Sequence, residues 1–338
     1  MPLAGSIIGG ELYPAKVLRD GAVGYWRLGE PSGLVAADAV ASPHDSAYTA
    51  AGVTFGVAGP LADGTTAVSY NGSTGYSTRA NNAAWAFGTG PMSVEFWFKT
   101  TMTTYGQILD TKIAGTNNAG FNVDIGGAVG KINFRVANGA AQVGVVAPLT
   151  YNDGAWHHFV GTFTRGTPDV LTVHIDGLAK NTGNPAANGW NITPVNTLDF
   201  GRYNGTVDPT AMFNGSLAHV ALYNVALTPR QVAEHYGLRL AVTSGLRVGG
   251  SAVIRQSRHV VGSGGVRIGG SAPIRQSRHV VGSGGVRVGG AGVVRGISVG
   301  RQADAIVRVG ADDVVVQVAA DDVVVRVRAD DVVTQVAP

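Results

Sequence analysis

The chain has 338 residues, 50 of them glycine, and it contains no cysteine. The lack of cysteine excludes a disulfide framework and a thiolate metal site. Only 14% of the residues are charged, and the net charge of +3 is unevenly spread: −3 over residues 1–238, +10 over 239–301 and −4 over 302–338. Apolar stretches are short and interrupted, so we expect no membrane insertion. We also expect no signal peptide, because no basic start precedes an apolar core.

Aromatic residues divide the chain into two parts. All five Trp precede residue 191, and Tyr236 is the last aromatic residue of any kind. A conventional globular core rarely avoids aromatic residues over so long a stretch. We therefore predict four segments: an N-terminal arm at 1–13, a globular domain at 14–238, Arg-rich repeats at 239–301 and Asp-Asp-Val repeats at 302–338.

Short alternations of apolar and polar residues run through the first part. In residues 93–99 the alternation places Val94, Phe96 and Phe98 on one face of a strand. Asp176-Gly177 predicts a hairpin turn. Thr228 followed by Pro229 predicts the start of one helix, over about 229–236. Further strands are predicted at 23–28, 107–109, 120–125, 131–136, 156–163, 171–175, 198–201 and 217–223. This pattern is typical of an all-β antiparallel sandwich.

Five motifs in order carry a family resemblance: VLRDGAVGYWRLGE (17–30), SVEFWF (93–98), DGAWHHFV (153–160), HIDG (174–177) and FNGSLAHVALYNVALT (213–228). Over residues 14–238 the chain resembles the laminin-G-like/concanavalin-A-like lectin superfamily, in the variant common in actinobacterial and phage proteins. The resemblance implies an antiparallel jelly-roll sandwich. Where members often carry an acidic pair in the last strand, this chain has Ala218 and His219, which puts a metal ligand there in doubt.

The residue pattern does not support an enzymatic function. Some relatives hydrolyse glycans, which requires two facing carboxyl groups. Glu95 is the only acid on its strand, and we interpret it as a polar position on the outer face. His157 and His158 are adjacent on a strand, so they point to opposite faces and cannot chelate one metal ion together. We therefore expect no catalytic residues.

Loop residues are the candidates for ligand binding. The resemblance implies that a calcium ion is held at the rim, where Asp199 and Asp208 are the candidate ligands, since carboxylates suit a hard cation. Glycan-binding loops combine aromatic rings with amides, and the candidates of this type are Tyr105, Trp190, Tyr203 and Asn204. The alternative is that these loops contain ordinary turn residues.

The tail consists of two repeats. Residues 244–303 repeat with a period of 20, and about 302–337 with a period of nine. Single units are too small to bury their apolar faces, so they need neighbours on which to stack. We predict a repetitive β tail in the form of an intertwined homotrimeric stem, with these arginines in assembly: Arg247, Arg255, Arg267, Arg275, Arg287 and Arg295. The alternative is a partly disordered linker. Without stacking aromatics we expect no nucleic acid partner.

A lectin-like sandwich joined to a repetitive tail is typical of a phage virion protein of the minor tail or fibre type. The expected partners are other copies of the chain, other virion proteins and a host-surface glycan. The expected location is the virion. Two alternatives stay open: a structural head-decoration or tail protein that binds no sugar, and a glycan hydrolase.

Overall fold

The computed structural model describes residues 12–112, 117–126, 130–203 and 211–240, and beyond these the strands β17 to β26. Two compact units are present: Pro14–Pro60 with Gly64–Tyr236 forms one, and Gly237–Pro338 belongs to the other. Most of the predicted N-terminal arm lies outside the described residues. No helix in the described part of the chain is long and apolar enough to cross a membrane.

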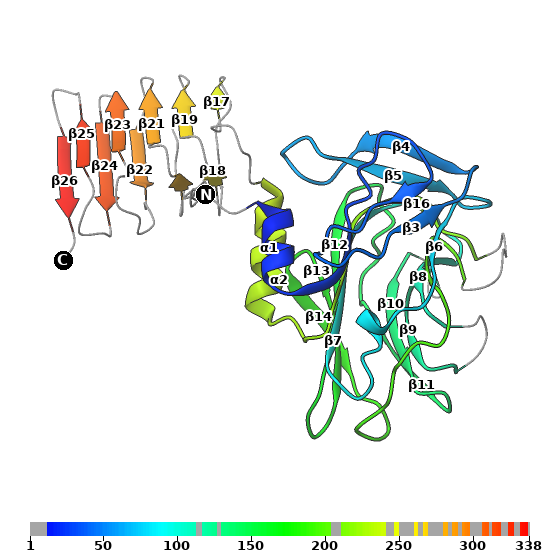
Figure 1. Ribbon diagram of the computed structural model, residues 1–338. Coiled ribbons are helices and arrows are strands. Elements are labelled where there is room, and N and C mark those ends of the chain that lie inside the picture. Colours follow the sequence, from blue (N-terminus) through cyan, green and yellow to red (C-terminus); the bar gives the residue numbers. More distant parts are fainter. Residues whose placement is uncertain are drawn as a thin grey trace, which may run out of the picture. The chain divides into compact units, whose positions relative to one another are not determined.

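The first unit is an antiparallel sandwich of two eight-stranded sheets (Figure 1). The first sheet has the order β14-β13-β12-β7-β16-β5-β4, with β1 paired to β16. Its strands are β14 (Leu178–Gly183), β13 (Val170–Ile175), β12 (His157–Thr164), β7 (Met92–Lys99), β16 (Asn214–Tyr223), β5 (Thr66–Asn71), β4 (Val53–Ala58) and β1 (Ala22–Trp26).

The second sheet has the order β11-β10-β9-β8-β15-β6-β3-β2. Its strands are β11 (Gln142–Val146), β10 (Ile132–Ala137), β9 (Gly120–Ile125), β8 (Gly106–Asp110), β15 (Leu198–Phe200), β6 (Ser77–Arg79), β3 (Ser46–Tyr48) and β2 (Val35–Ala36). The apolar core lies between the two sheets. Val94, Phe96 and Phe98 all belong to it, so the predicted alternation of β7 is confirmed.

Helices cover part of the outer face of the first sheet. The predicted helix is α2 (Pro229–Gly237), and Thr228 and Gln231 form a capping box at its start. The ring of Tyr236 stacks on Trp97 of β7, with the ring centres 5.8 Å apart. A second helix, α1 (Tyr13–Arg19), was not predicted because it has only two turns; it buries Tyr13 and Val17, four residues apart on one face. Short 3₁₀ helices occupy Ala83–Trp85 and Leu238–Leu240.

The predicted Asp176-Gly177 turn joins β13 to β14. Both turn residues have positive φ, 54° and 78°, as a type I′ hairpin turn requires. A Cβ on Gly177 would lie 3.0 Å from Cδ1 of Tyr236 on α2. The turn therefore needs glycine for its backbone conformation and for its close contact with the helix.

Replacing Gly177 by alanine is expected to lower the free energy of unfolding by about 1–2 kcal/mol, because the left-handed conformation strains a Cβ. Urea denaturation followed by Trp fluorescence measures the change. Gly139→Ala is the control: its φ is 93°, yet nothing lies within 4 Å of the added Cβ. A smaller loss in the control isolates the contact with Tyr236, whereas equal losses would show that the contact contributes nothing.

The tail strands pair in parallel within one chain. β17 (Arg247–Gly249), β19 (Val266–Gly269), β21 (Val286–Gly289), β23 (Ile306–Gly310) and β25 (Val324–Val327) form one sheet (Figure 1). The intervening strands are β18 (Val260–Gly262), β20 (Val280–Gly282), β22 (Val293–Ile297), β24 (Asp313–Val318) and β26 (Val332–Val336). β18 pairs with β20, and β22, β24 and β26 pair in order. The repeats thus stack on their neighbours along one chain, and the trimeric stem stays a prediction.

Candidate functional site

The outer face of the second sheet is lined with polar side chains. On β9, Phe121, Val123 and Ile125 enter the core, so Asn122 and Asp124 lie on the opposite face. On β10 the apolar residues alternate in the same way and leave Asn133 and Arg135 outside. The antiparallel register places Asn133 opposite Asp124 and Arg135 opposite Asn122. These four side chains form the centre of what we call the polar face.

The polar face continues across the neighbouring strands. On β8, Gln107 is the register partner of Asp124, and Asp110 is the partner of Asn122. Asp110 is in turn paired with Asp199 of β15, and Asp199 with Thr78 of β6. A continuous row of polar residues therefore crosses the sheet from β6 to β10. It was not visible in the sequence because these residues come from segments far apart in the chain.

Arginines compensate two carboxylates of the polar face. Asp124 forms an ion pair with Arg135. Asp199 is fully buried; its Oδ2 accepts a hydrogen bond from Nε of Arg202 at 2.7 Å, and its Oδ1 accepts one from the hydroxyl of Thr78. The guanidinium of Arg202 also lies 3.6 Å from the ring centre of Tyr76. These pairs hold the carboxylates in place on the sheet.

Three oxygens of the polar face lack a hydrogen-bond donor among the described residues. They are Oδ1 of Asn122, Oδ1 of Asp124 and Oδ1 of Asn133, and all three are buried. An unsatisfied buried acceptor costs about 1–3 kcal/mol, so such groups usually have a partner. The missing partners are donors, and hydroxyl groups of a ligand or water molecules would supply them. A Cβ on Gly144 of β11, opposite Arg135, would lie 3.0 Å from Oδ1 of Asn133, so glycine leaves space there.

Two aromatic residues flank the polar face. The rings of Tyr105 and Tyr203 stack with their centres 5.7 Å apart, and their hydroxyls are 2.8 Å apart. The hydroxyl of Tyr105 also donates to Oε1 of Gln107 at 2.8 Å. Burial raises the pKa of Tyr105, which keeps this hydroxyl protonated and able to donate. Two of the predicted ligand-binding aromatics are therefore adjacent, beside the polar row.

The other predicted site residues are placed differently. Trp190 lies in an irregular segment, as expected, but it is 6% exposed and packs in the core, so its ring is not presented at the surface. Asn204 and Asp208 lie outside the described residues. Both carboxylate oxygens of Asp199 are engaged by Arg202 and Thr78, which does not suit a calcium ligand. The described part of the chain holds no group of three or more His, Asp or Glu that could bind a metal ion.

The tail arginines are placed by the backbone alone. Arg247, Arg267 and Arg287 occupy equivalent positions in β17, β19 and β21. Arg295 lies in β22, opposite Val315 of β24. Arg255 and Arg275 fall outside the described residues. The role of these arginines in assembly stays a prediction.

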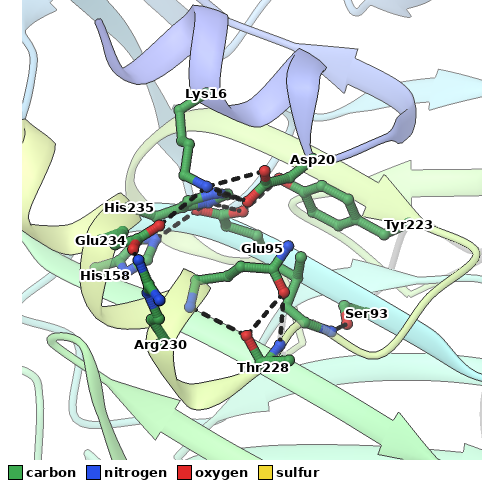
Figure 2. A network of polar contacts seen from close by, with 12 residues as sticks. Lys16, Asp20, Ser93, Glu95, His158, Tyr223, Thr228, Arg230, Glu234 and His235 are labelled. Carbon is green, nitrogen blue, oxygen red and sulfur yellow. Dashed lines mark hydrogen bonds and ion pairs between the residues drawn. The ribbon is translucent and has the colours of Figure 1, made fainter. Parts of the chain in front are cut away.

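A second polar cluster lies beneath helices α1 and α2 (Figure 2). Glu95 of β7 lies on the face away from the core, as predicted, but it is fully buried there because α2 covers it. Oε1 of Glu95 accepts hydrogen bonds from His158 at 2.7 Å and from His235 at 2.9 Å, and Oε2 accepts one from the Tyr223 hydroxyl at 2.5 Å. Nε2 of His235 lies 3.0 Å from Oδ2 of Asp20, the residue directly after α1.

This buried cluster holds structural elements together. Burial would raise the pKa of Glu95, but His235 and His158 outweigh it and hold that pKa well below its usual range. Burial would likewise lower the pKa of His235, but Glu95 and Asp20 raise it above its ordinary value. Since both ring nitrogens of His235 face carboxylates, the charged imidazolium fits the site. Both carboxylate oxygens of Glu95 and both ring nitrogens of His235 have partners within the cluster, so these two residues leave no polar group for a ligand to pair with.

Comparisons with known proteins agree with this architecture. Residues 71–233 match the family model of the Concanavalin A-like lectin/glucanases superfamily, Laminin_G_3. Neuronal pentraxin-1 of Homo sapiens is 32% identical over 117 residues, which are 33% of this chain and 26% of the pentraxin. The rat protein is 34% identical over 89 residues, covering 25% of this chain and 20% of its own length.

Solved structures show the same fold at low sequence identity. The binding domain of Paraclostridial Mosquitocidal Protein 1 superposes with a TM-score of 0.51 at 14% identity, covering 65% of this chain and 52% of that one. The W1252A mutant of HCR D/C VPI 5995 gives a TM-score of 0.50 at 13% identity, covering 66% and 53%. The chain thus spans about half of these structures and about a quarter of the pentraxin. The sandwich carries a laminin-G-like, concanavalin-A-like domain with a lectin-like fold.

Proposed function

We propose that the sandwich binds a glycan on its polar face. The observation that carries this proposal is the set of three buried oxygens, on Asn122, Asp124 and Asn133, that lack donors among the described residues. A sugar carries several closely spaced hydroxyl groups, and each can donate a hydrogen bond to one of these oxygens. The adjacent rings of Tyr105 and Tyr203 supply the aromatic surface that sugar faces favour.

The ion pairs and hydrogen bonds of the carboxylates favour glycan binding over glycan hydrolysis. A glycosidase needs one carboxyl group as a proton donor and a second as a base or nucleophile. On the polar face, Asp124 is ion-paired with Arg135, and Asp199 is ion-paired with Arg202 and bonded to Thr78. Asp110 accepts a hydrogen bond from the backbone N–H of Lys112 at 2.9 Å. These carboxylates are therefore occupied by ion pairs and hydrogen bonds. The polar face therefore supports a binding module rather than a glycan hydrolase.

The setting we propose is a phage virion. The chain would be a structural protein of the minor tail or fibre type that displays the sandwich to a host-surface glycan. Support comes from the combination of a lectin-like domain with a repetitive tail, and the similar structure from Paraclostridial Mosquitocidal Protein 1 is itself a binding domain. Several copies acting together, as in a trimer, would raise the avidity of weak sugar contacts. A head-decoration protein that binds no sugar is the alternative.

Replacing Asn133 by leucine is expected to weaken glycan binding by about tenfold or more, because a ligand hydroxyl loses its acceptor. The same change is expected to leave the free energy of unfolding unchanged or to raise it, because it removes an acceptor that has no donor in the unliganded protein. A glycan array probed with the full chain, together with urea denaturation, measures both quantities.

Asn224→Ala, at an exposed position after β16, is the matched control and should change neither quantity. A structural role for Asn133 predicts the reverse pattern, with lost stability and unchanged binding. An array on which the wild-type chain binds no glycan would contradict the proposed function and favour the purely structural alternative.

A further inference from the structure

Arginines of two different sequence repeats fall into one row of the tail sheet. In the strand order β17-β19-β21-β23-β25, the parallel register pairs each arginine with the next. The row consists of Arg247, Arg267, Arg287, Arg308 and Arg326. We call it the arginine row.

The arginine row is not a simple copy of one repeat. Its steps are 20, 20, 21 and 18 residues, so it crosses from the 20-residue repeat into the nine-residue repeat, where one step spans two units. The Asp-Asp-Val part of the chain, which has a negative net charge, still places arginines at the same register position. Two unrelated repeats therefore converge on one arrangement of positive charge.

The spacing makes this a dense line of charge. Neighbouring strands of a sheet lie about 4.7–4.9 Å apart, so five in-register arginines extend over about 20 Å. The other residues of these five strands are only Val, Ile and Gly. Like charges directly opposite one another are destabilising, so a partner with negative charge would stabilise the row.

We propose that the arginine row binds an anionic polysaccharide. A linear polymer with regularly spaced carboxylate or sulfate groups suits arginines that share one register position on successive strands, because guanidinium groups bind such oxyanions in bidentate geometry. No aromatic residue follows Tyr236, so the tail lacks the aromatic rings on which nucleic acid bases usually stack. A polyanion without bases is the partner that fits. This inference does not depend on the polar face of the sandwich.

Binding of the full chain to fluorescently labelled dextran sulfate, followed by anisotropy, tests the proposal. The wild-type chain is expected to bind dextran sulfate, with an affinity that falls as salt rises, and not to bind neutral dextran. Arg267→Gln with Arg287→Gln is expected to reduce the affinity at least tenfold. The corresponding double lysine variant should keep part of it, since lysine retains the charge but loses the bidentate geometry.

The control variant removes the same charge elsewhere: Lys99→Gln with Arg230→Gln, both at exposed positions of the sandwich. An equal loss in this control would overturn the proposal, because net charge alone would then explain binding. Tighter binding of single-stranded DNA than of dextran sulfate would also overturn it. Asn133→Leu should leave dextran sulfate binding unchanged, so that failure here and failure of the proposed glycan site are told apart.

Discussion

Replacing Glu95 by glutamine is expected to lower the free energy of unfolding by about 3–5 kcal/mol, since it leaves buried positive charge without its partner. His158 and His235 both contact this carboxylate, and neither has exposed side-chain surface. The variant keeps the shape of the side chain, so packing changes little. Urea denaturation followed by Trp fluorescence measures the loss, because every Trp lies in the sandwich.

Two further variants test the cause of the stability loss in Glu95→Gln. Glu234→Gln removes a carboxylate of the same residue type that is 39% exposed and pairs with Arg230 and Lys16, and it is expected to cost no more than about 1 kcal/mol. Glu95→Gln combined with His235→Gln removes both members of the buried pair, so its loss should be smaller than the sum of the two single losses. Additive losses would show that Glu95 and His235 are not coupled.

The strands of the sandwich were largely predictable because their signal is local. β9 and β10 follow from alternation alone, and the hairpin at Asp176 follows from two adjacent residues that tolerate positive φ. Edge strands such as β14, with the sequence LAKNTG, lack that alternation because little of the strand is buried. The pairing between β7 and β16, by contrast, joins segments more than a hundred residues apart and leaves no trace in the local sequence.

In the candidate site, too, local features were predictable and contacts between distant segments were not. Tyr105 and Tyr203 were identified by residue type, but their contact depends on how β8 and β15 are paired. Asn122 and Asn133 were missed because an amide on a strand has no local mark of function. The burial of Glu95 was missed for a similar reason: alternation correctly assigns it to the face away from the core, and only the position of α2 decides that this face is covered.

The pH dependence of stability should follow from two buried histidines that act in opposite directions. Burial lowers the pKa of His219 to about 3, so the folded sandwich holds this ring neutral while the unfolded chain protonates it near 6.5. Its contribution is therefore complete above pH 6.5 and is lost as the pH falls from there towards 3. The pKa of His235 is raised instead, so its contribution is complete below 6.5 and is lost as the pH rises through the raised value.

Other titratable groups add to the loss of stability at low pH and at high pH. The pKa values of Glu95 and Asp20 are lowered, because their histidine and lysine partners outweigh burial, so their contributions are lost as the pH falls through the lowered values. The pKa of His157 is raised, since Asp176 and Asp153 outweigh burial, and it adds to the loss at higher pH. Stability of the sandwich is thus expected to be greatest near pH 6.5 and to decline on both sides.

Replacing His219 by asparagine separates the loss of stability at low pH from the loss at high pH. Asparagine tolerates the φ of 54° at this position but does not titrate, although it loses the bond between the imidazole and the Tyr25 hydroxyl. The variant should be less stable at pH 7, yet between pH 6 and 4 it should lose about 2–3 kcal/mol less than the wild type, because one titrating group contributes up to about 1.4 kcal/mol per pH unit. His235→Gln should instead reduce the loss of stability above pH 6.5, and it should also change the curve at low pH, because His235 helps to hold the pKa of Glu95 low. Denaturation curves measured from pH 4 to 9 test both, and a His219→Asn curve that runs parallel to the wild type below pH 6 would show that folding does not lower the pKa of this ring.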